Sequence, residues 1–323
     1  MKTNSKAKPF IKWVGGKGQL LEQLDAQLPA NFENWNDVTY IEPFVGGGAM
    51  LFYMLQQYPN IRRAVINDVN SDLTTCYRTV RDMPEQLITS LMEIQNAYNE
   101  LESEEGRKEF FLAVRDRYNE KNLEPLENTT KFFFLNRTCF NGLYRVNAKG
   151  KFNVPFGRYL HPTICNSETI KADSEALNRS NVTILNGDFE RTIDEMGDGL
   201  NFVYFDPPYR PLNATSSFNS YAKEDFNDDE QIRLRNFCVR INERTNVRWM
   251  LSNADCSAKN PEDRFFETIY DGFFINRVYA SRAINANPAK RGKLTELLIC
   301  NYRPENYGVY AAEEVEPYNV AAV

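Results

Sequence analysis

The chain has 323 residues, of which 42% are hydrophobic and 25% are charged, a balance typical of a globular protein with a sizeable core and room for a second lobe. It has no run of roughly 18 uncharged apolar residues, and residues 1–8 are polar, which argues against a membrane span and a secretion signal. The net charge of -6 does not by itself suggest a nucleic-acid partner.

The first third of the chain predicts alternating strands and helices. Short apolar segments end in polar or glycine-rich turns, and helical segments follow them. The expected elements are a strand at Val38–Glu42, a glycine turn at residues 46–48, a helix at Ala49–Gln57, a strand at residues 64–67 that ends at Asp68, and a helix at residues 71–80. This βαβα order is typical of a parallel sheet with helices packed on it.

The middle of the chain has a different pattern. Residues 84–122 are charged, rich in Glu and Leu, and predicted to be helical, and residues 132–135 form an apolar run that we expect to be buried. Residues 141–155 contain glycines and alternate in polarity, which fits either a hairpin or a loop pinned by aromatic side chains.

The sheet pattern then resumes. The expected elements are strands at residues 182–185, 202–205 and 248–251, a helix at Asp228–Asn242, and a closing antiparallel pair at residues 273–279 and 296–301. We therefore predict an α/β domain formed by residues 1–80 and 168–323, interrupted by an insertion at residues 81–167.

The charges are unevenly distributed. Residues 128–167 contain no Asp or Glu, and a second basic stretch covers residues 277–293. The cations of the first stretch are Lys131, Arg137, Arg145, Lys149, Lys151 and Arg158. Aromatic residues lie between them, which favours a nucleic-acid surface over a merely solvated face.

Cysteine and histidine usage excludes several kinds of site. Six cysteines without a CxxC pair indicate a reducing cytoplasm rather than a disulfide scaffold. The single histidine, His161, excludes most histidine-based zinc sites and Ser–His or Cys–His nucleophiles unless His161 itself serves. We expect no metal and no covalent enzyme intermediate.

Polar residues and glycines follow several predicted strands, at the sheet edge where open α/β proteins bind ligands. The glycine turn at residues 46–48 matches neither GxGxxG nor a phosphate-binding lysine loop, so it fits a tight turn and a ligand loop equally well. Asp68 lies about 20–25 residues further on, as a ribose partner should, although a helix N-cap is the alternative.

The strongest signal is Asp206-Pro207-Pro208-Tyr209, directly after a predicted strand. Two prolines stiffen the backbone and remove two N–H donors, so the segment presents carbonyl oxygens, one carboxylate and an aromatic face. Such an acceptor-rich corner suits an exocyclic amino group on a planar base, which can donate two hydrogens and stack on Tyr209.

With these motifs, the chain resembles the Dam-type, class D12, DNA adenine-N6 methyltransferases over about residues 9–303. The motifs stand in the family's order: FIKWVGGK at 10–17, EPFVGGG at 42–48, NDVN at 67–70, the segment 140–159, DPPY at 206–209 and LTELL at 294–298. The resemblance implies a Rossmann-like, S-adenosylmethionine-dependent methyltransferase fold with an inserted, mainly helical target-recognition domain that contains a β-hairpin.

The resemblance also implies roles for particular residues. The cofactor S-adenosylmethionine is expected to contact Trp13, Lys17, Phe44, Gly46, Gly48, Asp68, Asp188, Phe189 and Asp206. The target adenine is expected at the catalytic segment Asp206, Pro207, Pro208 and Tyr209. Double-stranded DNA is expected to contact Lys12, Phe140, Asn141, Leu143, Arg145, Pro155 and Tyr159. The family's usual residue before Arg145 is small, whereas this chain has Tyr144.

The expected reaction is methyl transfer to N6 of an adenine flipped out of duplex DNA, with GATC as the best single guess for the site. The alternatives are an N4-cytosine or RNA adenine methyltransferase, a DNA-binding protein without catalysis, and a nucleotide-binding oxidoreductase, which the missing GxGxxG disfavours. We expect a cytoplasmic, DNA-associated protein of bacterial or phage type, a monomer or weak dimer on DNA, functionally linked to a restriction endonuclease or acting alone, with no membrane partner.

Overall fold

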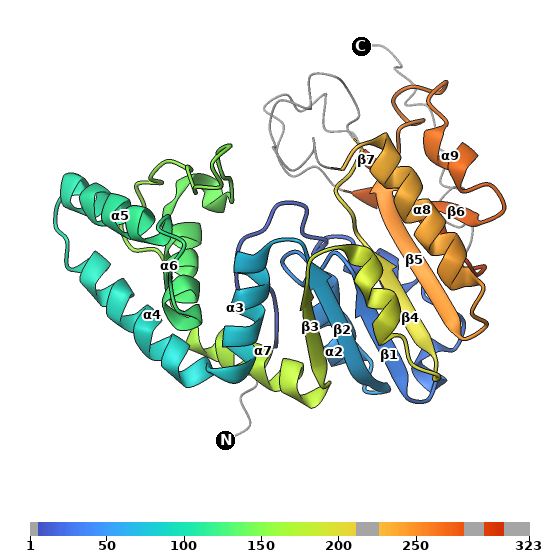
Figure 1. The fold of residues 1–323 in the computed structure, drawn as a ribbon, viewed down its shortest axis with the longest axis horizontal. Helices are drawn as coiled ribbons and strands as arrows, with labels where there is room; N and C mark the ends of the chain where they lie inside the picture. Colours follow the sequence, from blue (N-terminus) through green and yellow to red (C-terminus); the bar gives the residue numbers. More distant parts are fainter. Residues whose placement is uncertain (1–5, 211–225, 281–293, 307–323) are drawn as a thin grey trace, which may run out of the picture.

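The computed structural model describes residues 6–210, 226–280 and 294–306. In this part of the chain a seven-stranded sheet has the order β3-β2-β1-β4-β5-β7-β6 (Figure 1). The strands are β1 (Val38–Glu42), β2 (Ile61–Asp68), β3 (Val182–Asn186), β4 (Asn201–Phe205), β5 (Val247–Ala254), β6 (Phe274–Ala280) and β7 (Leu294–Cys300). Strands β1 to β5 are parallel, and β7 is antiparallel to both β5 and β6. The predicted parallel sheet and its closing antiparallel pair are confirmed.

The helices also follow the sequence pattern closely. They are α1 (Leu21–Asp25), α2 (Ala49–Gln57), α3 (Ser71–Asp82), α4 (Pro84–Asn99), α5 (Glu104–Tyr118), α6 (Pro125–Thr138), α7 (Ser167–Arg179), α8 (Asp228–Asn242) and α9 (Phe265–Ile269). The bounds of α2 and α8 are those predicted, and four helices begin after a side chain that accepts a backbone N–H. These caps are Asn70, Ser103, Asn166 and Asn227. The short helices α1 and α9 and the longer α7 were not predicted.

The central strands are buried on both faces, and successive residues enter two different cores. On β1, Tyr40 belongs to one cluster and Ile41 to the other, and on β4 Phe202 and Val203 divide in the same way. The first cluster packs under α2, α3 and α7, and the second lies under α8 and α9. This alternation follows from the period of two along a strand.

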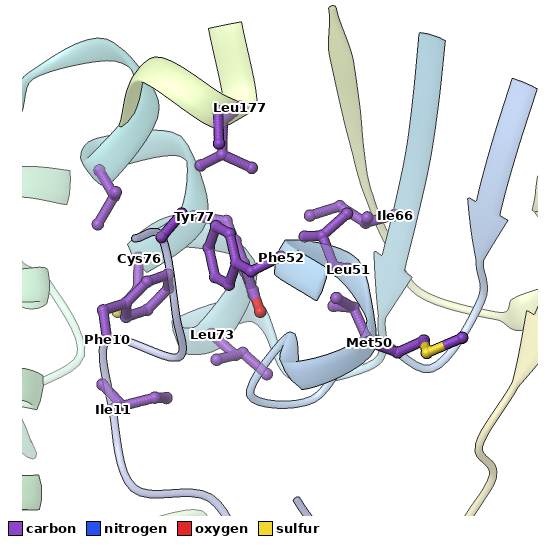
Figure 2. Close-up of a cluster of buried hydrophobic side chains, with 14 of the residues drawn as sticks. Phe10, Ile11, Met50, Leu51, Phe52, Ile66, Leu73, Cys76, Tyr77 and Leu177 are labelled. Atoms are coloured by element: carbon purple, nitrogen blue, oxygen red, sulfur yellow. The ribbon is translucent and has the colours of Figure 1, made fainter. Parts of the chain in front are cut away.

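Figure 2 shows part of the first cluster, where the amino-terminal segment inserts between helices. The ring of Phe10 lies 4.9 Å from that of Tyr77 on α3 and stacks 5.4 Å from Phe133 on α6. The segment that precedes the first helix is therefore anchored in the core, which fixes the residues that follow Phe10.

Helices α4, α5 and α6 lie beside α3 and α7, away from the β4 to β6 side of the sheet (Figure 1). The predicted burial of residues 132–135 is confirmed, because all four side chains on α6 are at most 2% exposed. The predicted junction at residues 80 and 81 falls inside α3, so this helix continues from the sheet towards the group formed by α4 to α6.

Residues 139–156 form a loop with two arms. The arms meet at two isolated antiparallel bridges, Cys139 with Phe156 and Val146 with Phe152. The tip is closed by Asn147 N, which donates to Lys151 O at 2.9 Å. The segment thus has a hairpin's path but only isolated pairing in place of continuous strands. Among the described helices, none is both long and apolar enough to cross a membrane.

Candidate active site

The loops at the carboxyl ends of β1, β2 and β3 are tied together by asparagine side chains. Asn67 Nδ2 donates to Pro43 O at 3.0 Å and to Gly187 O at 2.9 Å. Asn186 Nδ2 donates to Asp68 O at 2.8 Å. Polar groups that are distant in sequence are therefore held at one edge of the sheet, as expected for parallel strands.

Asp68 organises the glycine turn. Its Oδ2 accepts the Gly46 N–H at 3.0 Å, and its Oδ1 accepts the Asn70 N–H at 2.9 Å. Burial raises the pKa of Asp68, and these two backbone bonds act in the opposite direction. The side chain therefore spans the turn after β1 and the start of α3.

The glycines of this turn make room for protein side chains. A Cβ on Gly47 would lie 2.9 Å from Trp13 Cβ, and a Cβ on Gly48 would collide with the Tyr77 hydroxyl. Gly46 and Gly48 also have positive φ angles of 49° and 76°, which L side chains rarely adopt. The tight-turn interpretation is thus satisfied, and Trp13 is placed directly against the turn.

The DPPY segment lies in a partly buried ionic cluster. Lys17 Nζ, on a residue that is only 6% exposed, lies 3.2 Å from Asp206 Oδ1 and 3.0 Å from Glu296 Oε2. It also donates to the Tyr209 hydroxyl at 2.5 Å, and that hydroxyl donates to Glu296 Oε2 at 2.8 Å. We refer to Lys17, Asp206, Tyr209 and Glu296 as the Lys17 cluster.

The neighbours of Asp206 in the Lys17 cluster shift its pKa in opposite directions. Burial raises the pKa of Asp206 to about 6, Lys17 lowers it, and the nearby Glu296 carboxylate raises it. Asp206 is therefore largely ionised near pH 7, although its surroundings disfavour the charged form of the carboxyl group. A partly buried acceptor of this kind binds an amino group more strongly than a fully exposed one.

A hydrogen bond to Pro208 and ion pairs of Arg210 hold the DPPY corner in place. Pro208 O accepts a hydrogen bond from Gln231 Nε2 at 3.0 Å, and Gln231 in turn accepts from Asn253 Nδ2 at 3.0 Å. Within residues 6–210, 226–280 and 294–306 we find no hydrogen bond to Pro207 O. Arg210 closes the segment, with ion pairs to Asp228 at 2.7 Å and Asp263 at 2.6 Å.

Phe44, Asp188 and Phe189, all predicted to contact the cofactor, lie together. The Phe44 and Phe189 rings are 5.2 Å apart. The Asp188 carboxylate caps its own turn through Glu190 N at 2.9 Å and pairs with Arg233 at 2.8 Å, which lowers the pKa of Asp188. Phe44 is half-buried, so an aromatic surface remains beside the loops.

The residues predicted to contact DNA come from two parts of the chain that meet. Lys12 Nζ lies 5.5 Å from the centre of the Tyr159 ring. Phe140 and Leu143 are 53% and 37% exposed, although large apolar side chains are usually buried. Asn141, between them, has a left-handed backbone with φ of 55°.

The remaining predicted DNA residues lie on the same loop. Arg145 is exposed, and Asn153 holds its guanidinium through Oδ1 at 2.8 Å and the main-chain oxygen at 3.2 Å. Pro155 O accepts the Phe140 N–H at 2.8 Å. Tyr144 turns inward, where its ring lies 5.4 Å from that of Trp13 and its hydroxyl donates to Asp72 at 3.2 Å. The unusual tyrosine thus serves packing.

Two polar residues of evident structural importance were not predicted as site residues. Glu296 completes the Lys17 cluster, and Asn136 bonds to the amino-terminal segment near Lys12. The signal for Glu296 was a lone carboxylate in the apolar run of β7, where burial without a partner would be costly. Asn136 follows a buried apolar run on α6 and offered a similar clue.

Comparison with known proteins gives a consistent result. A family model described as D12 class N6 adenine-specific DNA methyltransferase matches residues 13–284. The type II methyltransferase M.MjaIII of Methanocaldococcus jannaschii is 48% identical over 298 residues, which are 91% of this chain and 99% of that protein. The type II methyltransferase M1.LlaDCHI of Lactococcus lactis subsp. cremoris is 40% identical over 298 residues, covering 91% and 95% of the two chains. The DNA adenine methylase of Escherichia coli K12 is 30% identical over 301 residues, covering 93% and 96%.

The residues that the family model matches include β1 to β6, the helical group and the DPPY corner. The mixed α/β fold with a seven-stranded sheet agrees with the methyltransferase fold that the sequence motifs predicted. The chain therefore belongs to the D12 class N6 adenine-specific DNA methyltransferases, which implies DNA as the substrate and S-adenosylmethionine as the methyl donor.

Proposed function

We propose that this enzyme methylates N6 of an adenine extruded from duplex DNA, at the sequence GATC. The observation that carries the proposal is the Lys17 cluster, which surrounds the Asp206 carboxylate with one cation, one phenol and a second carboxylate. The enzymes of the family act on adenine in DNA, and the names of several relatives include DNA adenine methylase.

In this proposal the DPPY corner binds the target amine. The Asp206 carboxylate and the Pro207 carbonyl oxygen accept the two N6 hydrogens, and Tyr209 stacks on the purine. Accepting both hydrogens directs the nitrogen lone pair away from the ring plane and stabilises the positive charge that develops on nitrogen. The extra proton leaves after transfer, so the site needs no strong base.

The residues at the sheet edge fit S-adenosylmethionine, which supplies an electrophilic methyl group when bound. Both Asp68 oxygens already accept one backbone N–H, but a carboxylate has further lone pairs for ribose hydroxyls. Phe44, Asp188 and Phe189 offer an aromatic and acidic surface for the adenine ring of the cofactor. Trp13 packs against the turn that contains Gly46 and Gly48, and we propose that these three residues contact the rest of the cofactor. Lys17 was predicted as a cofactor contact, but its bonds to Asp206 and Tyr209 favour a role at the target amine.

For DNA we propose that residues 81–167 act as a target-recognition domain. The exposed Phe140 or Asn141 fills the space that the extruded base leaves, since stacking lost on extrusion costs a few kcal/mol. Arg145 and Leu143 contact base edges, Lys12 reaches a guanine, and Pro155 and Tyr159 lie near the duplex. The absence of Asp and Glu from residues 128–167 keeps repulsion of phosphates low.

We further propose that the enzyme works in the cytoplasm, as a monomer or weak dimer on DNA. The type II names of two relatives support a functional link to a restriction endonuclease.

The test is methyl transfer from labelled S-adenosylmethionine to duplex DNA, followed by mapping of N6-methyladenine. We expect label at adenine in GATC, and we expect Asp206→Ala to abolish transfer while the circular dichroism spectrum stays that of the folded protein. Retained activity in the folded Asp206→Ala variant refutes the proposed amine site. Label on cytosine N4 or on RNA identifies a different substrate, and DNA binding without product identifies a non-catalytic protein.

A further inference from the structure

The side-chain amide of Asn136 on α6 makes three hydrogen bonds at a junction of three chain segments. Asn136 is only 3% exposed. Its Oδ1 accepts the Lys12 N–H at 2.8 Å, and its Nδ2 donates to Lys12 O at 2.8 Å and to Gly142 O at 3.0 Å. The amide therefore pairs with Lys12 as a neighbouring strand would, and also binds the turn at Phe140–Gly142.

The segments that Asn136 joins approach each other closely. Gly142 has a φ of 64°, and a Cβ there would lie 3.0 Å from Lys12 Cβ and 3.1 Å from Asn136 O, and would collide with Lys12 Cδ. Lys12 belongs to the amino-terminal segment and lies 124 residues from Asn136 in sequence. The amide bonds and the missing Cβ hold Lys12 against this turn, in addition to the stacking of Phe10 on Phe133 and the bond from Arg137 to Phe10 O at 2.7 Å.

The amino-terminal segment reaches two other places within a few residues. Trp13 packs against the turn at Gly47 and against Tyr144, and Lys17 enters the Lys17 cluster with Asp206. Asn136 thus binds Lys12 at one end of a short segment, and Lys17 at the other end pairs with the Asp206 carboxylate. The exposed loop residue Phe140 begins the turn that the same amide binds, and the exposed Leu143 follows it.

We propose that Asn136 is a positioning residue that couples recognition of the DNA sequence to methyl transfer. It sets Lys12 against the loop that carries Leu143 and Arg145, and any displacement of this loop by DNA is passed through the Lys12 backbone towards Trp13 and Lys17. The inference rests on the proposed function, because it needs a DNA sequence that the enzyme distinguishes.

The substitution that isolates this role is Asn136→Asp, which keeps the shape but cannot donate to Lys12 O or Gly142 O. A matched control exists at the amino end of β4. Asn201 is 0% exposed, its Oδ1 accepts Gly197 N at 3.1 Å, and its Nδ2 donates to Gly197 O at 2.9 Å and Gly199 O at 2.8 Å. Asn201→Asp therefore removes an equivalent pair of donated bonds, at the opposite end of the strand from DPPY.

The measurement is a ratio of two kcat/KM values. The first is for a duplex with the sequence that the wild-type enzyme methylates in plasmid DNA. The second is for duplexes in which one base pair of that sequence, other than the target adenine, is changed. We expect this ratio to fall at least about tenfold in Asn136→Asp, since misplacing a base-reading contact costs discrimination of that size. We expect the ratio to stay at its wild-type value in Asn201→Asp.

A second variant protects the test against misfolding. Gly142→Ala keeps the Asn136 side chain, but its Cβ crowds Lys12 and the Asn136 main-chain oxygen at a positive φ, so we expect the same fall in the ratio. An unchanged ratio in folded Asn136→Asp, or in Gly142→Ala when Asn136→Asp does not fold, overturns the inference, as does an equal fall in Asn201→Asp. Failure of the proposed function is seen separately, because the wild-type enzyme would then leave adenine in DNA unmethylated.

Discussion

Glu296→Gln tests whether the Lys17 cluster prepares Asp206 for the target amine. The glutamine keeps the volume of the side chain and one acceptor oxygen but removes the charge that pairs with Lys17 at 3.0 Å. A charge-assisted hydrogen bond contributes about 1.5–3 kcal/mol and a neutral one about 1 kcal/mol. The difference of about 0.5–2 kcal/mol corresponds to a decrease in kcat of about 2- to 30-fold.

The same substitution has a second effect of known sign. The pKa of Asp206 is raised to about 6 by burial first, and the Glu296 carboxylate adds to that increase. Removing the Glu296 charge therefore lowers the pKa of Asp206. Since Asp206 must be ionised to accept the N6 hydrogens, the acid limb of kcat/KM, near pH 6 in the wild-type enzyme, is expected at lower pH in the variant.

The assay is steady-state methyl transfer between pH 5 and 8.5, with saturating S-adenosylmethionine and varied duplex DNA. The matched control is Glu267→Gln. Glu267 and Glu296 have side chains that are 15% and 14% exposed, and Glu267 pairs with Arg277 at 2.9 Å, outside the Lys17 cluster. We expect Glu267→Gln to leave both kcat and the acid limb unchanged.

Two results would refute this reasoning. If Glu296→Gln keeps the wild-type kcat, the Lys17 cluster does not organise the reaction. If kcat falls but the acid limb stays at its wild-type pH, Asp206 is not the group whose ionisation limits the rate.

Two further predictions concern recognition and stability. Arg145→Ala should reduce discrimination between the methylated sequence and single-base variants by about 5- to 150-fold, while the Kd for S-adenosylmethionine changes little; equal losses on all duplexes would indicate a phosphate contact instead. Asp173 on α7 is fully buried, which raises its pKa to about 8, so the folded state loses stability as the pH rises from about 4 to 8. Asp173→Asn, whose Oδ1 can still accept the Lys8 N–H, should increase the free energy of unfolding in urea by a few kcal/mol at pH 8 and by little near pH 4; an equal increase at both pH values would show that the carboxylate charge is not the cause.

The elements of the sheet could be predicted because their signals are local. The apolar run at β1, the periodicity and Asn227 cap of α8, and the prolines after β4 each lie within a few residues. The family motifs likewise lie in continuous segments, so the residues of the DPPY corner could be named from the sequence. The short α1 and α9 could not, since helices of one turn depend on the packing around them.

The sequence by itself therefore determined the α/β class, the order of the elements, the methyltransferase family and the acceptor-rich corner. Only the tertiary structure decided how the site is assembled. It brings Glu296 to Lys17 across 279 residues and Asn136 to Lys12 across 124 residues, and it packs Trp13 against the glycine turn. Contacts between segments so far apart leave no local pattern, because they depend on burial and hydrogen bonding that exist only once the sheet and the helices have packed.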